Sequence, residues 1–363
     1  MLKMIHETLE KVVRDEDLSR AEAEAAMEEI LAGRANGAEI AGLLTALRMK
    51  GETVEEVVGF ATAMRRHATP IFRGGWTRSN EALVDTCGTG GDAQGTFNVS
   101  TAAAFVVAAA GVHVAKHGNR SYTSKCGSAD VLEQFGVVLD VEAAQVARSI
   151  EEIGIGFLFA PAMHAAMRNA MTVRRELGMR TVFNLLGPLT NPAGASAQVV
   201  GVYDESVTEL VARALGELGV RRAFVVRGAD GLDEISISGE TQIAELRDGE
   251  VFNYSVTPED FGLRRAPIEA LRGGDAAENA GIIHKLFGRS LLVKEHGPRR
   301  DIVLANAAAA LVAAGKARDF LEGVRIAAAA IDSGAAREKL DALVAFTGGE
   351  RAGKNQGGSV TGG

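Results

Sequence analysis

The chain has 363 residues, 47% of them hydrophobic, which is enough for more than one domain with a substantial buried core. Lysine and arginine number 39 against 47 aspartates and glutamates, so the formal net charge is −8. Proteins whose main partner is a polyanion usually carry a basic excess, and this balance therefore disfavours nucleic acid and anionic membranes as partners. Cys87 and Cys126 form neither a CxxC pair nor a zinc spacing, which disfavours a disulfide scaffold and a structural zinc site. Without a signal-peptide pattern or an apolar run near the roughly 20 residues of a membrane span, the chain is expected to be soluble and cytoplasmic.

The first part of the chain, residues 1–74, has the periodicity of helices. Ile5, Leu9 and Val12 recur at three- and four-residue steps, and Thr53 with Glu56 has the pattern of a capping box. The composition then changes to proline, glycine, tryptophan and serine around residues 70–80, which marks a boundary. We therefore expect a small all-helical N-terminal domain, joined by helices around residues 165–192.

Beyond this boundary, short apolar runs alternate with glycine loops and helices. This alternation predicts an α/β domain over residues 75–347 with a mostly parallel central sheet and helices on both of its faces. The expected strands are 82–85, 112–115, 155–159, 198–203 and 223–227, and the expected helices include 101–110, 129–135, 302–314 and 321–332. A hairpin is expected at residues 241–254 because Asp248-Gly249 is a favoured two-residue turn. Residues 348–363 are polar and rich in glycine, so they are expected to form a flexible tail.

The most informative segment is Asp85-Thr-Cys-Gly-Thr-Gly-Gly-Asp92, which precedes a helix that opens with Asn98-Val-Ser-Thr101. Three glycines in four positions remove Cβ atoms where a ligand can meet the backbone, and exposed N–H groups favour phosphate oxygens. The spacing fits neither the dinucleotide fingerprint nor the Walker loop. An anion cradle is the favoured interpretation, and a tight strand-to-helix turn is the alternative.

A second segment, Lys116-His-Gly-Asn-Arg120, is expected to form a loop after the next strand and thus to lie beside the first. Its two cations suit a polyphosphate, although a solvated basic turn remains possible from this loop alone. The adjacent carboxylates Asp233 and Glu234, expected in a turn after a strand, suit magnesium, and an ordinary acidic turn is the alternative. A third segment, residues 164–192, is rich in arginine, and periodicity does not choose among Arg168, Arg174 and Arg175.

These segments resemble, in order and spacing, those of the anthranilate phosphoribosyltransferase family, and the resemblance extends from the N-terminal helices to about Gly348. The residues that carry it are Gly88 to Asp92, Asn98 to Thr101, Lys116 to Arg120, Gly127 to Asp130, Asn184 to Pro192, and Asp233-Glu234. The resemblance implies a glycosyltransferase of tryptophan biosynthesis. Its reaction would move phosphoribose from 5-phosphoribosyl 1-pyrophosphate (PRPP) to the amino group of anthranilate, giving N-(5-phosphoribosyl)anthranilate and pyrophosphate. Magnesium (Mg²⁺) as cofactor and a homodimer formed through the N-terminal helices are implied as well.

The resemblance also implies roles for individual residues, and none of them is a catalytic acid or base. The implied PRPP-binding residues are Gly88, Thr89, Gly90, Gly91, Asp92, Thr96, Asn98, Ser100, Thr101, Lys116 and Ser128. The implied anthranilate-binding residues are Gly88, His117, Asn119, His164, Arg174, Gly187 and Pro188. Ser100, Asp233 and Glu234 are the implied magnesium ligands. Two other functions stay open: a pyrimidine nucleoside phosphorylase, which resembles this family in architecture, and a catalytically silent relative that binds nucleic acid.

Overall fold

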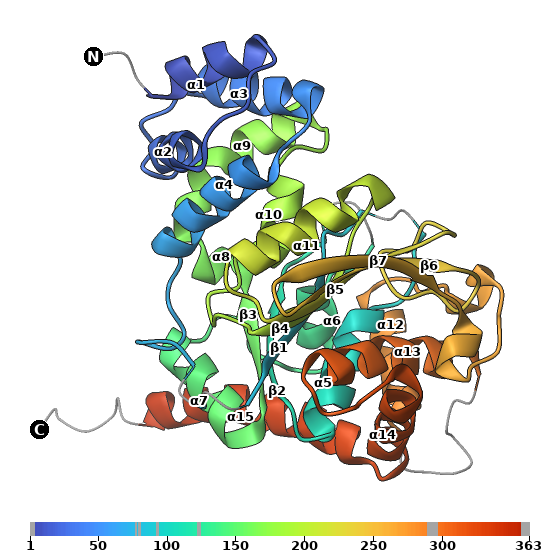
Figure 1. The fold of residues 1–363 in the computed structure, drawn as a ribbon. Helices are drawn as coiled ribbons and strands as arrows, with labels where there is room; N and C mark the ends of the chain where they lie inside the picture. The colour runs from blue at the N-terminus through green and yellow to red at the C-terminus, as the bar shows by residue number, and fades with distance from the viewer. Residues whose placement is uncertain are drawn as a thin grey trace, which may run out of the picture.

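A computed structural model describes residues 4–76, 78, 81–91, 94–121, 125–288 and 297–356, with side chains as far as residue 348. Its N-terminal part is a group of helices that stands apart from the sheet (Figure 1). These helices are α1 (Met4–Val13), α2 (Arg20–Leu31), α3 (Gly37–Lys50) and α4 (Val54–His67). The capping box of Thr53 and Glu56 is confirmed at the start of α4, since each residue's backbone N–H donates to the other's side chain, at 2.9 and 3.3 Å.

The second part is built on a seven-stranded sheet with the order β3-β2-β1-β4-β5-β6-β7. Strands β1 to β5 run parallel, and β6 and β7 are antiparallel, so the predicted α/β class with a mostly parallel sheet is confirmed. The strands are β1 (Leu83–Gly88), β2 (His113–Gly118), β3 (Ile155–Phe159), β4 (Ala197–Gly201), β5 (Arg222–Gly228), β6 (Thr241–Arg247) and β7 (Glu250–Val256). Asp248 and Gly249 both have positive φ, at 53° and 81°, and make the predicted hairpin turn between β6 and β7.

Three strand ends differ from the predictions. Strand β1 continues to Gly88 because it pairs with β4 as far as Gly201, and β2 continues to Gly118 because it pairs with β3 as far as Phe159. Strand β4 ends at Gly201: the Val202 N–H makes the last bond to β5, at Val226 O, and the Tyr203 N–H donates to the Thr89 hydroxyl instead of extending the ladder. The first three residues of the predicted Lys116–Arg120 loop therefore belong to β2, and the prediction of a loop is wrong for them.

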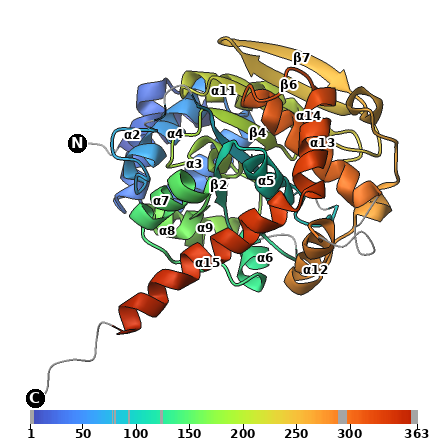
Figure 2. The ribbon, with the colours of Figure 1, turned by 90° about the horizontal axis from the view of Figure 1, so that it is seen from below.

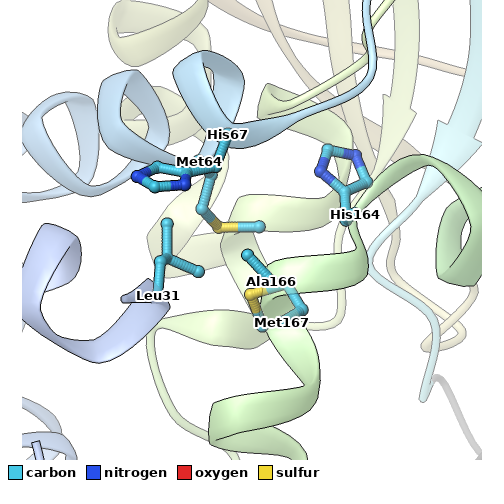
Figure 3. A pocket seen from close by; sticks show the side chains of 6 residues that line it. All are labelled: Leu31, Met64, His67, His164, Ala166 and Met167. Atoms are coloured by element: carbon cyan, nitrogen blue, oxygen red, sulfur yellow. The ribbon is translucent and has the colours of Figure 1, made fainter. Parts of the chain in front are cut away.

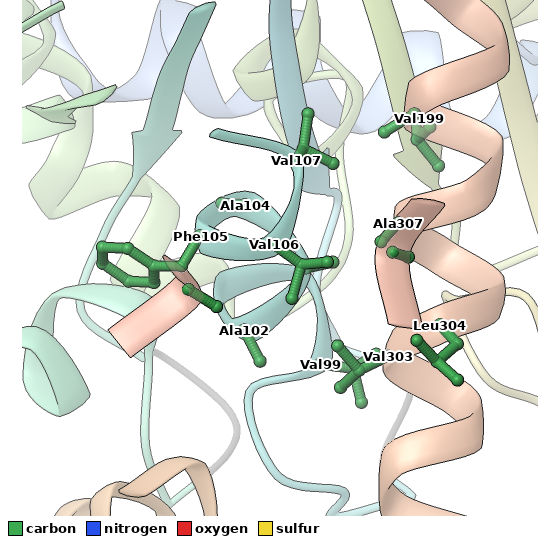
Figure 4. Close-up of a cluster of buried hydrophobic side chains, with 14 of the residues drawn as sticks. Val99, Ala102, Ala104, Phe105, Val106, Val107, Val199, Val303, Leu304 and Ala307 are labelled. Carbon is green, nitrogen blue, oxygen red and sulfur yellow. The ribbon is translucent and has the colours of Figure 1, made fainter. Parts of the chain in front are cut away.

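Helices cover both faces of the sheet, and the strand side chains alternate between two cores. Val199 and Phe224 face a core shared with α5 and α13, whereas the adjacent Val200 and Val225 face a core shared with α10, α11 and the N-terminal helices. In the first core, Val99 and Val106 of α5 lie opposite Val303 of α13 (Figure 4). Figure 2 shows α5, α6 and α15 on this side of the molecule.

The helices of the second part are α5 (Val99–Ala109), α6 (Ser128–Gln134), α7 (Ala143–Ile153), α8 (Ala160–Met163), α9 (Arg168–Leu177), α10 (Phe183–Leu189), α11 (Thr208–Glu217), α12 (Ala276–Leu286), α13 (Pro298–Ala313), α14 (Phe320–Asp332) and α15 (Ala335–Gln356). Short 3₁₀ helices are η1 (Ala165–Met167), η2 (Glu205–Val207), η3 (Pro258–Phe261) and η4 (Ile268–Leu271). Helix α15 runs through Gly348 to Gln356, so half of the segment expected to be a flexible tail is helical, and the remainder lies outside the described residues. None of the helices in the described ranges is long and apolar enough to cross a membrane.

Candidate active site

Most of the predicted site residues that the structure describes lie at or near the carboxyl ends of the parallel strands. From β1 the chain moves to β2 and β3 on one side, and it returns to β4 and β5 on the other side, so the strand order reverses between β1 and β4. Ligands of open α/β sheets bind at such a reversal, outside the strand ends. The segments that follow β1, β4 and β5 here are the glycine loop, residues 202–203 and the loop that contains Asp233 and Glu234.

The glycine loop after β1 is held by backbone hydrogen bonds to its neighbours. Thr89 N–H donates to Gly201 O (2.8 Å), and Gly90 N–H donates to Oδ2 of Asp233 (3.1 Å). A Cβ atom on Gly88 would lie 2.9 Å from the same Asp233 oxygen, which explains the absence of a side chain there. The structure therefore brings Gly88, Thr89, Gly90 and Asp233 together, whereas Asp92 lies outside the described residues.

Glu234 joins this loop to the start of α5. Its Oε1 accepts the Ser100 N–H at 3.0 Å, and a carboxylate at the first turn of a helix is stabilised by the helix dipole. A small hollow at this point is lined by Thr86, Cys87, Ser100, Ala103, Val199, Glu234 and Asn306. Two of the three implied magnesium ligands, Ser100 and Glu234, thus lie in contact, and the third, Asp233, contacts the glycine loop.

The donor set fits magnesium bound together with a phosphate. Within the described ranges no group of three or more His, Cys, Asp and Glu side chains could hold a metal ion by itself. Magnesium, however, is commonly held by one or two carboxylates and completes its shell with water and substrate phosphate oxygens. Asp233 and Glu234 supply two such carboxylates, the first at the Gly90 N–H of the glycine loop and the second at the Ser100 N–H of α5.

Lys116 is a residue of β2, and its side chain extends toward the neighbouring strand β1. It is only 3% exposed, and its Nζ donates to Thr86 O and lies 3.5 Å from Oγ of Ser100. Burial lowers the pKa of Lys116, and the nearby Asp85 carboxylate opposes this shift. Arg120, in contrast, forms ion pairs with Asp130 (2.9 Å) and Glu133 (2.5 Å), so its charge is already matched within the chain.

The other implied PRPP residues surround the start of α5 and α6. The Oγ atom of Ser128 accepts the Asn119 N–H at 3.2 Å, and Asn98 Nδ2 donates to Cys126 O at 3.3 Å. Thr96 forms an isolated bridge with Arg272. Thr101 is fully buried in α5, and its Oγ1 has no hydrogen-bond partner among the described residues.

His117 and His164 form a buried pair on the other side of the strand ends. Their ring centroids are 5.2 Å apart, and Nδ1 of His117 lies 3.2 Å from Gly187 O. Burial lowers the pKa of His117 to about 3, with a further contribution from His164, and it lowers the pKa of His164 to about 4. Both imidazoles are therefore neutral near pH 7, and three of the implied anthranilate residues, His117, His164 and Gly187, lie together.

These two histidines predict a loss of stability in mild acid. The unfolded chain takes up their protons as the pH falls below about 6.5, whereas the folded chain does so only near pH 4 and pH 3. Each histidine should therefore lower the free energy of unfolding by up to about 1.4 kcal/mol per pH unit within that window. Urea unfolding between pH 7 and 5 measures this slope.

The double substitution His117→Asn with His164→Asn should make that slope shallower. The matched control is His284→Asn on the exposed face of α12, which should leave the slope as it is. Equal slopes for the double variant and the unsubstituted chain would contradict the assigned protonation states.

Arg174 lies where α9 meets α10. Its guanidinium group stands 5.0 Å from the centroid of the Phe183 ring, and its Nη1 lies 3.8 Å from Sδ of Met171. Phe183 is the first residue of α10, which also contains the implied anthranilate-binding residues Gly187 and Pro188. Arg174 therefore lies at the N-terminal end of that helix. Arg168 and Arg175, which periodicity could not distinguish from it, are exposed.

A small pocket borders His164 on the side of the N-terminal helices. It is lined by Leu31, Met64, His67, His164, Ala166 and Met167. Figure 3 shows the α4 residues among them on one side and His164, Ala166 and Met167 on the other. The implied anthranilate side of the site thus lies at the junction of the helical and α/β parts.

Several residues that hold this site were not among the predicted site residues. Nη2 of Arg180 donates to Gly91 O, and its guanidinium group lies 4.4 Å from the centroid of the Tyr203 ring. Asp85, which is fully buried, accepts the backbone N–H of His117 (3.1 Å) and Nδ2–H of Asn191 (2.8 Å). Asn306 was also missed, although it is the one polar residue within the alanine-rich stretch 302–314, which is a usable signal.

Two comparisons of sequence place the chain among known proteins. Residues 80–337 match the a/b domain of a glycosyl transferase family, and residues 6–68 match the helical bundle domain of a glycosyl transferase family. The anthranilate phosphoribosyltransferase of Symbiobacterium thermophilum is 56% identical over 339 residues, which cover 93% of this chain and 96% of that protein. That of Moorella thermoacetica is 54% identical and covers 94% and 98%.

Solved structures agree with the sequence comparisons. The crystal structure of anthranilate phosphoribosyltransferase from Thermus thermophilus has a TM-score of 0.87 and 46% identity, covering 94% of this chain and 99% of that one. The Saccharomyces cerevisiae enzyme in complex with PRPP and Mg has a TM-score of 0.84 and 28% identity, with coverage of 95% and 98%. These findings support the transferase interpretation and neither alternative. The chain belongs to the anthranilate phosphoribosyltransferase family.

Proposed function

We propose that this chain transfers the phosphoribosyl group of PRPP to the amino group of anthranilate, with release of pyrophosphate. The observation that carries the proposal is the contact of the glycine loop with Asp233 and of the α5 start with Glu234, at the reversal point of the sheet. This arrangement places two carboxylates, which would hold magnesium, beside the backbone of the glycine loop and of the α5 start, where a polyphosphate would lie. The yeast relative of known structure is a complex with PRPP and Mg.

Stabilisation of the leaving group is the main task of the proposed PRPP site. Departure of pyrophosphate leaves a sugar with positive character, and N–H groups aimed at the growing negative charge lower the barrier. The proposed PRPP-binding residues are Gly88, Thr89, Gly90, Gly91, Asp92, Thr96, Asn98, Ser100, Thr101, Lys116 and Ser128. Asp233, Glu234 and Ser100 would hold magnesium, which supplies positive charge for the phosphate oxygens when it is bound.

The proposed anthranilate side uses neutral and cationic groups to orient the amine. An aromatic amine attacks without prior deprotonation, so no side chain is assigned as a general base. The neutral imidazoles of His117 and His164 add no charge beside the substrate, and Arg174 can grip its carboxylate with two N–H groups. The proposed residues on this side are Gly88, His117, Asn119, His164, Arg174, Gly187 and Pro188.

A direct assay tests the proposed function. The protein is mixed with anthranilate, PRPP and magnesium, and the loss of anthranilate fluorescence is followed over time. Omission of PRPP or addition of a chelator should stop the reaction. No turnover in this assay, together with phosphorolysis of thymidine or uridine, would overturn the proposal in favour of a nucleoside phosphorylase.

Arg174→Ala should impair the use of anthranilate far more than that of PRPP. Loss of a bidentate, charge-assisted contact costs about 1.5–3 kcal/mol, so we expect KM for anthranilate to rise by roughly 10- to 100-fold. Steady-state kinetics with each substrate varied in turn measures both constants. Arg175→Ala is the matched control, since Arg175 is the exposed neighbour on the same helix and should change neither constant. Equal effects of Arg174→Ala on both substrates would remove Arg174 from this role.

We also propose that helices α9 and α10 complete the N-terminal domain. Helix α9 contacts α2 and α3, α10 contacts α4, and Asn169 Nδ2 donates to Leu31 O at 2.8 Å.

The family resemblance leads us to propose a homodimer formed through the N-terminal helices. Val13 of α1 and Met49 of α3, which are 70% and 84% exposed, are apolar side chains that such an interface would cover. Sedimentation of Met49→Glu against the unsubstituted chain tests the dimer. Cys87 and Cys126 are not joined in a disulfide, in keeping with a cytoplasmic location.

A further inference from the structure

Asn306 is a buried polar residue in the middle of α13, a helix that is otherwise apolar on its packed side. It is 2% exposed and lies between Ala305 and Ala307. Figure 4 shows the neighbouring Leu304 and Ala307 on the side of α13 that faces α5 and β4. A buried amide at such a position is costly unless its donors and acceptor are satisfied.

The amide of Asn306 is satisfied mainly by one residue outside its own helix. Its Oδ1 accepts the N–H of Ile235 at 2.9 Å, and its Nδ2 donates to the C=O of Ile235 at 3.1 Å. The second hydrogen of Nδ2 reaches Ile302 O, one turn earlier in α13, at 2.9 Å. Two bonds to both backbone groups of one residue fix the position and the rotation of its peptide units, as in one rung of a sheet ladder.

Ile235 directly follows Asp233 and Glu234, and this part of the chain belongs to no helix or strand. Its buried backbone groups therefore need a partner from elsewhere, and Asn306 supplies that partner. Asn306 also lines the same hollow as Ser100 and Glu234. The two hydrogen bonds from Asn306 therefore fix Ile235, the residue that directly follows Glu234, and so fix the backbone from which the Glu234 side chain extends.

We infer that Asn306 is a positioning residue for the magnesium site, a role that rests on the proposed function of Asp233 and Glu234. By holding Ile235 against α13, Asn306 keeps the Glu234 carboxylate at the N–H of Ser100. The opposite side of the turn is held by the backbone of Asp233, which packs against Gly201. A buried asparagine with only a packing role would instead affect stability and leave metal affinity unchanged.

Two substitutions separate these roles. Asn306→Leu keeps the volume and removes both bonds to Ile235, whereas Asn306→Asp keeps an acceptor for the Ile235 N–H and loses the donor for its C=O. Leu311→Ala is the control for stability, because Leu311 is a fully buried residue of the same helix that lines no part of the hollow. Asp233→Asn is the comparator for direct loss of a proposed metal ligand.

The test measures binding of Mn²⁺, used as a probe for the magnesium site, by electron paramagnetic resonance with PRPP present and anthranilate absent. Hydrogen–deuterium exchange of the peptide that contains Ile235 is measured on the same variants. We expect Asn306→Leu to weaken Mn²⁺ binding by roughly 10-fold or more and to speed exchange at Ile235, with a smaller effect for Asn306→Asp. Leu311→Ala should leave Mn²⁺ affinity unchanged.

Unchanged Mn²⁺ affinity in Asn306→Leu, with faster exchange at Ile235, overturns the inference. If Asp233→Asn still binds Mn²⁺ more weakly, that result leaves the proposed metal site standing. Unchanged affinity in Asp233→Asn would instead count against the proposed site itself. If Asn306→Leu does not fold, the same comparison is made with Asn306→Asp, and unchanged affinity there likewise overturns the inference.

Discussion

Gly201→Ala is expected to slow phosphoribosyl transfer by roughly 100-fold and to weaken the fold. A Cβ atom at this position would lie 1.6 Å from the backbone oxygen of Asp233 and 2.4 Å from its carbonyl carbon. Both are backbone atoms, so the clash cannot be relieved by rotating a side chain. Either the end of β4 or the turn at Asp233 has to move.

This movement would displace two parts of the proposed PRPP site, the glycine loop after β1 and the turn that contains Asp233. Gly201 pairs with Gly88 and accepts the Thr89 N–H, while Asp233 accepts the Gly90 N–H. Overpacking costs about 1–3 kcal/mol of stability, and a displacement near 1 Å in an active site lowers the rate by roughly 100-fold. Steady-state kinetics and urea unfolding of the same preparation measure the two effects.

Gly281→Ala is the matched control for this substitution. Gly281 lies within α12, and a Cβ atom there would meet nothing within 4 Å. Alanine is a better helix former than glycine by about 0.5–1 kcal/mol, so this variant should be as active as the unsubstituted chain and slightly more stable. A Gly201→Ala variant with kcat/KM within a few-fold of the unsubstituted value would show that the turn tolerates the displacement.

Local pattern was sufficient to predict the fold class, the hairpin at Asp248-Gly249 and the capping box at Thr53. These features depend on turn-forming residues and on the spacing of apolar side chains, and both can be recognised from residues that are close together in the sequence. The glycine loop and the Asp233-Glu234 pair could be predicted as parts of one site because loops after parallel strands share one edge of a sheet. Their direct contact, through the Gly90 N–H, became visible only in the structure.

Features that depend on the pairing of distant strands could not be predicted. Lys116 was expected in a loop, but the pairing of β2 with β3 continues past it. Lys116 is therefore a strand residue, and its side chain reaches Thr86 O of β1. Gly201 has no motif of its own, because its need for glycine comes from Asp233, which lies beyond the next strand. Asn306 is recognisable as a polar residue among alanines, but its partner Ile235, which is 71 residues away in the chain, could not be predicted from that pattern.

Asp85→Ala is expected to be strongly destabilising, because Asp85 is a fully buried carboxylate that accepts hydrogen bonds from two buried donors. Its Oδ1 accepts the His117 N–H, and its Oδ2 accepts Nδ2–H of Asn191, which also donates to Ala115 O at 2.8 Å. Burial raises the pKa of Asp85, and the charge of the buried Lys116 opposes this shift. Removal of the carboxylate would leave the His117 N–H and the Nδ2–H of Asn191 without this acceptor, and it would remove a negative charge that acts on the buried Lys116. A buried donor left without an acceptor costs about 1–3 kcal/mol.

A double-mutant cycle separates the charge pair from the hydrogen bonds. Lys116→Met removes the ammonium group and keeps an apolar stem, and the cycle compares it with Asp85→Ala and with the double variant by urea unfolding. If the two charges stabilise each other, the double variant should lose less than the sum of the single losses, by roughly 0.5–3 kcal/mol. Asp140→Ala, at an exposed aspartate, is the control and should change stability by less than about 0.5 kcal/mol. Additive losses would contradict the electrostatic pairing and would leave the bonds to His117 and Asn191 as the whole reason for a carboxylate inside the sheet.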